Sequence, residues 1–236
     1  MDNRSIISKY KDLHNEVLSD FSIKWNPEKS KNFKSDVIKF FYFEKEFDWN
    51  ILLNALYVID DTEYAKKNYL KFKLSGPTKI LDIGEQYLRL YGILNAVYQQ
   101  QLAIINLIEI HKIPHKSKIV NDLKKYKIIE LRNKIGAHST NYISNDSKDF
   151  DVYEISRVDL ENDKILLIKN QDIDESYDLE SLLCEFDYEI QRIYSIILNK
   201  FLKKKNITKY LTILDNIDFE KDGGLLIGDI KIFKHK

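Results

Sequence analysis

The most apolar part of this 236-residue chain is YLRLYGILNAVYQQQLAIINLIEI, residues 87–110. Apolar residues recur every three to four positions along it, which predicts a long helix over about residues 80–111 that ends before Pro114. Charged and amide side chains, from Arg89 to Asn106, interrupt the stretch and make it too polar to span a bilayer. We therefore expect it to be the central helix of a buried core.

Similar spacing predicts further helices on both sides of this segment. The predicted helices cover residues 6–21, residues 117–138 with Ser117 as a cap, and residues 179–202. Asp61-Thr62-Glu63 resembles the capped start of another helix, which stops before Ser75-Gly76-Pro77. The aromatic stretch 40–43 fits either a buried strand or a helical segment, because periodicity does not separate the two in so short a run.

Two segments in the second half of the chain favour strands. Residues 152–158 and 164–169 flank Glu161-Asn162-Asp163, which predicts a β-hairpin, and a short strand is expected within residues 225–233. The fold class is therefore mainly α, with a β-hairpin insertion and a short C-terminal strand. We expect one domain over residues 1–236, with its core at about 80–202, the hairpin at about 151–169 and a C-terminal extension at 206–236.

Composition limits where and on what the protein acts. The 37 basic and 37 acidic residues give zero formal net charge, so RNA binding would need a local basic patch. Cys184 is the only cysteine, which excludes an intramolecular disulfide. With no signal segment at the N-terminus, these features predict a cytoplasmic protein.

The segment Arg132-Asn133-Lys134-Ile135-Gly136-Ala137-His138 lies at the end of the predicted helix 117–138. An arginine, a polar residue, a short spacer and a histidine in this position resemble the catalytic motif of the HEPN family, in which four to six residues separate Arg from His; here five do. The resemblance implies a HEPN-like helical bundle covering at least residues 80–202. It also implies a two-fold homodimer with the motif helices at its interface and, as in many members, metal-independent RNA cleavage without a cofactor. Family members act as toxins, antiphage effectors and RNA-processing enzymes.

The residue types of this motif suit RNA cleavage. A neutral His138 can take the proton from a ribose 2′-OH, and Arg132 can neutralise the charge of the phosphorane. The products would carry a 2′,3′-cyclic phosphate and a 5′-OH. Asn133 can orient the histidine or hold the phosphate. The predicted substrate-binding residues are Lys134, Ser139, Thr140 and Tyr142.

Helix geometry separates the two catalytic candidates. In one straight α-helix, His138 lies about 120° around and about 9 Å along the axis from Arg132. Leu131 and Ile135 form an apolar stripe between them, and a partner helix packed on this stripe could bring Arg132 of one chain near His138 of the other. Gly136 permits close helix approach or a local bend. Either device would assemble the site.

Alternative interpretations remain. Arg132 and His138 can be plain cations at a helix C-terminus, with Gly136 as its cap. The chain can be an inactive HEPN module that binds nucleotide, RNA or a partner protein, or a toxin silenced by an antitoxin that modifies Tyr142. No metal is expected, since Pro114 breaks the helix that a His111–His115 pair would need for shared ligation.

Overall fold

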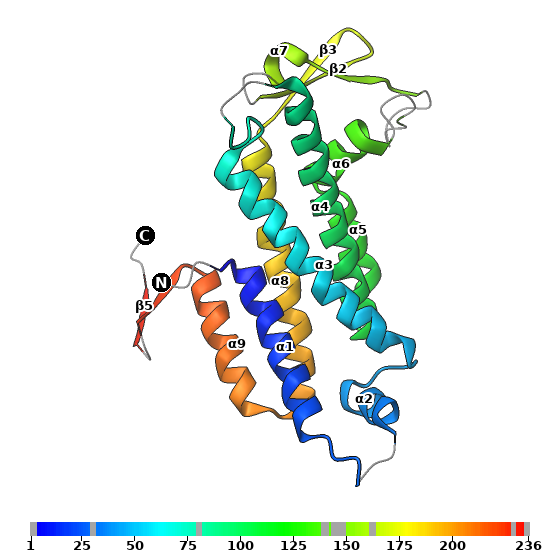
Figure 1. The fold of residues 1–236 in the computed structure, drawn as a ribbon, viewed down its shortest axis with the longest axis vertical. Coiled ribbons are helices and arrows are strands. Elements are labelled where there is room, and N and C mark those ends of the chain that lie inside the picture. Colours follow the sequence, from blue (N-terminus) through cyan, green and yellow to red (C-terminus); the bar gives the residue numbers. More distant parts are fainter. Residues whose placement is uncertain are drawn as a thin grey trace. The chain divides into compact units, whose positions relative to one another are not determined.

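The computed structural model describes residues 4–28, 32–78, 82–137, 142, 150–160, 164–227 and 230–233. The fold is mainly helical, as predicted (Figure 1). The helices are α1 (Ile6–Lys24), α2 (Phe33–Phe41), α3 (Phe47–Phe72), α4 (Ile83–Ile110), α5 (Lys116–Lys124), α6 (Lys127–Arg132), a π-helix η1 (Asn133–Ala137), α7 (Arg157–Leu160), α8 (Leu179–Lys205) and α9 (Thr208–Lys221). The strands are β1 (Tyr153–Ile155), β2 (Ile165–Lys169), β3 (Ile173–Tyr177), β4 (Gly224–Ile227) and β5 (Ile230–Phe233).

Internal contacts group the chain into two compact units. Unit 1 consists of Met1–Asp60, Leu102–Ser117 and Tyr188–Lys236, and unit 2 of Asp61–Gln101 and Lys118–Asp187. The long helices α3, α4 and α8 each contribute one part to each unit. The prediction of a single domain stays a prediction.

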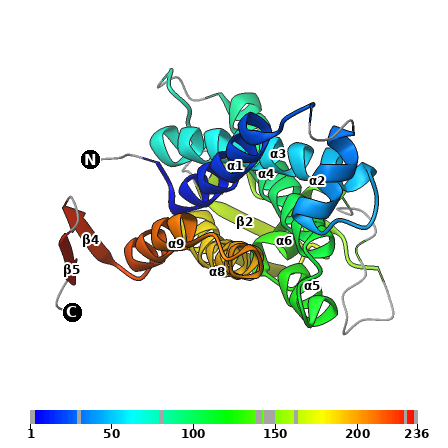
Figure 2. The same cartoon turned by 90° about the horizontal axis from the view of Figure 1, so that it is seen from below.

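Unit 1 is built around α1, which packs against α9. The Ser5 side chain caps α1 by accepting a hydrogen bond from the Ser8 N–H at 3.0 Å, and Asn32 caps α2 in the same way. Tyr10 and Leu13 of α1 are fully or almost fully buried, as are Tyr194 and Phe201 of α8. Figure 2 shows the antiparallel β4–β5 hairpin at the end of α9.

Unit 2 combines helices with a three-stranded antiparallel sheet of order β1-β2-β3. Tyr153 lies opposite Lys169, and Ile165 lies opposite Tyr177. Ile165 and Leu167 of β2 are buried on one face, as the two-residue period of a half-buried strand requires. In the order of the chain, this sheet follows the segment that carries the candidate motif.

The three most periodic helices are confirmed: α1, α4 and α8 occupy the predicted ranges to within a few residues. The predicted hairpin is confirmed as β1 and β2, with the short helix α7 between them, but β3 was not predicted. The C-terminal segment forms two strands where one was expected, and the helix α9 was also missed. The aromatic stretch at 40–43 contains the end of α2 and is not a strand.

Two helix boundaries were predicted wrongly. Asp61-Thr62-Glu63 does not start a helix, because it lies inside the continuous α3, with Thr62 buried. The single helix expected over 117–138 is divided into α5, α6 and η1 over its described part. Among the described helices, none has both the length and the apolar character that crossing a membrane requires.

Candidate active site

The Arg132–His138 motif begins where an α-helix changes into a π-helix. The last α-helical residue of α6 is Arg132, and η1 runs from Asn133 to Ala137. A π-turn bonds residue i to residue i+5, is uncommon in proteins, and often occurs at functional sites. The straight-helix geometry used to separate Arg132 from His138 therefore does not hold beyond residue 132. His138, Ser139 and Thr140 lie outside the described residues.

Arg132 lies over an aromatic ring. Its guanidinium carbon lies 3.9 Å from the ring centroid of Tyr98 in α4, which is a cation–π contact. Its Nη1 donates a hydrogen bond to the Asn133 side-chain oxygen at 3.1 Å. Within the described part of the chain, no carboxylate forms a salt bridge with Arg132, and its side chain is half-buried. Much of its fork of donors is thus available to an incoming anion.

Asn133 contacts Arg132 in this arrangement. Its side-chain oxygen accepts a hydrogen bond from Arg132, so the NH₂ group is the part of the amide that can donate to a substrate. The predicted roles were to orient the histidine or to hold phosphate. The observed contact adds a third role, which is to fix the guanidinium of its neighbour.

Lys134 lies in a different environment from Arg132. Only 5% of the residue is exposed, and its ammonium lies 2.7 Å from carboxylate oxygens of Glu130 and of Glu175 and donates to the Tyr177 hydroxyl at 3.0 Å. Burial alone would lower the pKa of Lys134, but the hydrogen bonds to Glu130 and Glu175 outweigh it and raise that pKa. Lys134 therefore ties η1 to β3. This placement argues against the predicted contact of Lys134 with substrate.

Tyr142 lies beside Lys134 and the partners of its ammonium group. Its backbone pairs with Asp151, its ring makes an edge contact with Tyr153 at a centroid distance of 5.7 Å, and the Lys134 ammonium is 6.0 Å from its ring. Burial, followed by the charge of Glu130, raises the pKa of the Tyr142 phenol. The phenol is therefore neutral at physiological pH and can donate a hydrogen bond. The structure thus brings Tyr142 near Lys134, two of the predicted site residues.

The apolar stripe of the motif is already used within the chain. Leu131 is fully buried and Ile135 is 6% exposed, both in unit 2. The prediction that a partner helix packs on this stripe is therefore wrong. Gly136 is exposed, and a Cβ built on it meets no atom within 4 Å. The surface of η1 at Gly136 is therefore open in the single chain.

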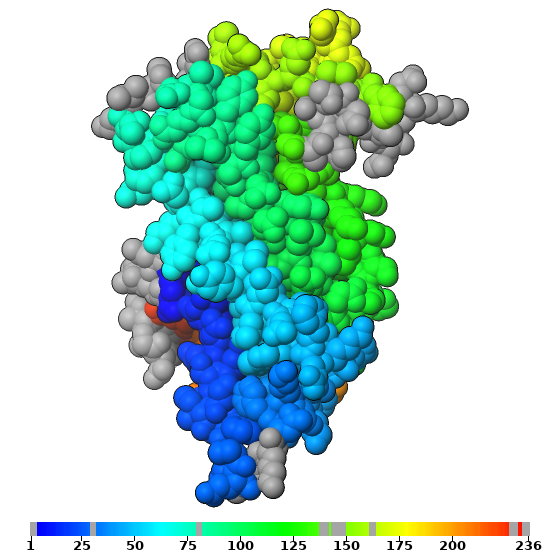
Figure 3. Space-filling model, turned by 45° about the vertical axis from the view of Figure 1, so that its right-hand side comes forward, coloured from blue at the N-terminus to red at the C-terminus, as the bar shows by residue number. Residues whose placement is uncertain are grey.

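Sequence reasoning missed several residues next to the motif. A cavity of about 300 Å³ opens beside Ile135, and Tyr87, Tyr91, Tyr153 and Arg157 are part of its lining. Tyr87 and Tyr91 stack one turn apart on α4, with ring centroids 6.0 Å apart. Figure 3 shows the α4 segment of unit 2, coloured teal to green, open to solvent.

The sequence signal for these residues was present but was assigned to the core. The apolar periodicity of residues 87–110 includes Tyr87, Tyr91 and Tyr98 and by itself predicts them on the core face of the helix. Their spacing of four and seven residues brings them onto one side of α4, and Tyr91 is 44% exposed. Exposed aromatic residues on one helix face are the feature that could have indicated them.

In the described part of the chain, no group of three or more His, Cys, Asp or Glu side chains could hold a metal ion. His111 is 7% exposed and lies in the core of unit 1 with its ring facing His14. His115, by contrast, is exposed.

Comparison with known proteins found no relative of this chain. No family model, no curated protein and no solved structure matches the chain.

Proposed function

We propose that this chain is a metal-independent endoribonuclease of the HEPN type. The observation that carries the proposal is Arg132, half-buried on the Tyr98 ring at the start of a π-turn and without a carboxylate partner among the described residues. An arginine held in this way keeps its charge and its planar donors for an anion such as an RNA phosphate. The motif resemblance supplies His138 as the partner.

The proposed reaction is an internal transfer at phosphorus. His138 removes the proton from the ribose 2′-OH, the 2′ oxygen bonds to phosphorus, and the bond from phosphorus to the 5′ oxygen breaks. Arg132 stabilises the additional negative charge on the phosphorane oxygens. The departing 5′ oxygen takes a proton from water or from an acid in the site. The products are a 2′,3′-cyclic phosphate and a 5′-OH.

Local structure favours a single-stranded substrate. Tyr87 and Tyr91 provide stacked rings, with the exposed Arg157 in the lining of the same cavity beside η1. Unpaired bases stack on such rings, and arginine pairs with the phosphates between them. Because the net charge of the chain is zero, binding must depend on these local contacts.

The proposed biological setting follows from the resemblance. We place the enzyme in the cytoplasm as a toxin or antiphage effector that acts as a homodimer and is restrained by an antitoxin or another defence protein. The face around Gly136, where a Cβ would meet no atom within 4 Å, is the part of η1 that leaves room for a second copy.

The test is an assay of the purified full chain on mixed RNA in EDTA, with fragment ends analysed for cyclic phosphate. Wild type should cleave, and Arg132→Ala and His138→Ala should lose at least about a hundredfold in rate. His115→Asn is the matched control, since His115 is exposed and asparagine tolerates its positive φ of 55°. Equal activity of wild type and His138→Ala would overturn the proposal. RNA binding without cleavage would instead identify an inactive binding module.

A further inference from the structure

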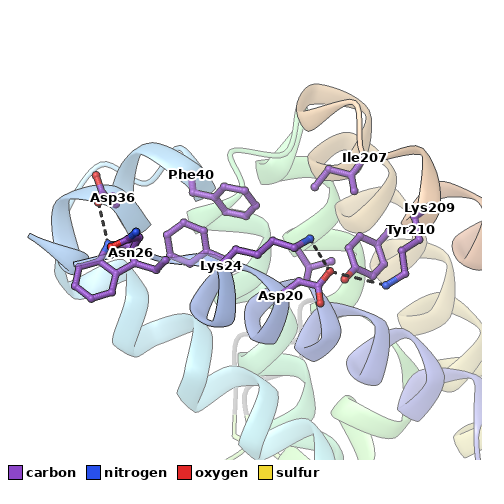
Figure 4. Close-up of a pocket in the computed structure, with 11 residues that line it drawn as sticks. Asp20, Lys24, Asn26, Asp36, Phe40, Ile207, Lys209 and Tyr210 are labelled. Carbon is purple, nitrogen blue, oxygen red and sulfur yellow. Dashed lines mark hydrogen bonds and ion pairs between the residues drawn. The ribbon is translucent and has the colours of Figure 1, made fainter. Parts of the chain in front are cut away.

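A second cavity, in unit 1, has the features of a binding site for a small molecule. Its volume is about 550 Å³, compared with about 330 and 300 Å³ for the two other cavities described. Figure 4 shows its walls, which come from α1, from α2 and from the start of α9. A cavity of this size accommodates a compact organic molecule.

The floor of this cavity is apolar and largely aromatic. Phe21 of α1 and Phe40 of α2 lie against each other with ring centroids 4.5 Å apart, and Val17 and Ile207 extend the apolar surface. The Trp25 indole N–H donates to the Asp36 carboxylate at 3.0 Å, so the polar atom of this ring already has its partner. The floor therefore offers rings and methyl groups to a ligand.

Positive charge gathers at the end of the cavity nearest α9. The Lys24 and Lys209 ammonium groups lie 3.3 and 3.8 Å from one oxygen of Asp20, so two cations share one carboxylate. The Tyr210 hydroxyl beside Asp20, more than the two lysines, lowers the pKa of the Asp20 carboxyl.

We propose that this cavity binds a small oxyanion with an apolar body, either a carboxylate or a phosphate monoester. The apolar part lies on Phe21, Phe40 and Trp25, and the oxyanion accepts hydrogen bonds from Lys24 and Lys209. Two lysines and two aspartates line the cavity, but Asp36 lies with Trp25 at the opposite end, as Figure 4 shows. At the α9 end Asp20 is therefore the one carboxylate of the lining beside the two ammonium groups, and this local positive charge attracts the anion. The site is separate from the RNA motif, and its test does not depend on RNA cleavage.

The fluorescence of Trp25 reports directly whether a ligand occupies the cavity. The chain has two tryptophans, Trp25 and Trp49, so Trp49→Phe leaves Trp25 as the only tryptophan, which is excited at a wavelength that tyrosine does not absorb. Decanoate and decyl phosphate, each below its micelle concentration, should change Trp25 emission saturably, and the tighter of the two identifies the head group. Decanol and decyltrimethylammonium carry the same chain without the anion and should bind about tenfold more weakly or worse. If Trp49→Phe lowers the unfolding midpoint, calorimetry on the wild-type chain replaces fluorescence.

The lysines are tested by substitution in the same assay. The double variant Lys24→Met, Lys209→Met should weaken decanoate or decyl phosphate about tenfold and leave decanol unchanged. Lys45→Met, an exposed lysine outside the cavity, should stay within about twofold of the parent protein. The proposal is overturned if neither anion gives saturable binding, if the cation or alcohol binds equally well, or if the double variant behaves like Lys45→Met.

Discussion

A buried histidine pair in unit 1 should make the protein sensitive to mild acid. His14 of α1 is fully buried and His111, directly after α4, is 7% exposed, with ring centroids 5.3 Å apart. Phe201 packs against both rings. The Nε2 atom of each ring has no hydrogen-bond partner among the described residues. A proton added to either ring would therefore place a charge in an aromatic core.

The direction of the effect follows from the pKa shifts. Burial, with a smaller contribution from the Lys200 ammonium, lowers the pKa of His111 to about 3. Burial and then the neighbouring His111 lower the pKa of His14 well below its ordinary value. The unfolded chain takes up these protons near pH 6.5, while the folded chain does not, so stability is complete above pH 6.5 and is lost as pH falls below it.

The size of the effect can be worked out for a change from about pH 7.5 to about pH 5. Each histidine that stays neutral in the folded state lowers the unfolding free energy by about 2 kcal/mol over this interval, because the loss is about 1.4 kcal/mol for each pH unit below the unfolded pKa. The pair therefore costs about 4 kcal/mol, a large part of the roughly 5–15 kcal/mol that stabilises a typical domain.

The assay is urea unfolding at the two pH values, on wild type and on His14→Leu and His111→Leu. Leucine is similar in volume to histidine and does not titrate, so each variant should lose about 2 kcal/mol less than wild type on acidification. His115→Asn, at an exposed position, is the control and should follow wild type. A loss in both leucine variants equal to that of wild type would refute the reasoning.

Three further changes test the motif region. Lys134→Met should lower the unfolding free energy by about 2–3 kcal/mol, because it leaves the partly buried Glu175 without its cation, and Glu175→Gln in addition should recover part of this loss in urea unfolding. Tyr98→Phe should keep the ring under Arg132 and retain RNA cleavage, whereas Tyr98→Ala should reduce the cleavage rate about tenfold. Gly136→Val should leave a folded chain but weaken the proposed dimer in sedimentation, since a Cβ at this position meets no atom within 4 Å in one chain.

Matched controls separate these effects from general damage. Lys118→Met, at an exposed position, should leave the unfolding free energy within about 0.5 kcal/mol of wild type. Gly92→Val in α4 makes the same change at another open helical glycine. A cleavage rate in Tyr98→Ala equal to that in Tyr98→Phe would count against a role for the ring. A monomeric wild-type chain at micromolar concentration would contradict the dimer.

Sequence alone determined the helices whose burial is periodic. Apolar residues at three-to-four spacing must lie on one side of a helix, and α1, α4 and α8 bury that side in the fold. It also determined which chemical groups lie together in the motif, since Arg132, Asn133 and Lys134 are adjacent in the chain. These features depend on local geometry, which a linear pattern records.

Tertiary contacts decided the features that sequence reasoning missed. Asp61-Thr62-Glu63 resembles a helix start, but Ile59 and Lys66 are buried on either side of it, and burial keeps α3 continuous. The strand β3, IDESY, has no alternation of apolar residues and exists because it pairs with β2. Cap signals and strand patterns are local, and a partner distant in sequence can override them.

The candidate site shows most clearly what sequence determines and what tertiary contacts decide. Arg132 and Lys134 are two residues apart and were both expected to face RNA phosphate. The fold places Arg132 over Tyr98 without a carboxylate partner among the described residues, while Glu130 and Glu175 neutralise Lys134 in a buried site. The residue types were readable in the chain. Tertiary folding brings carboxylates to Lys134 and an aromatic ring to Arg132, and these contacts decided which of the two cations is available to bind a ligand.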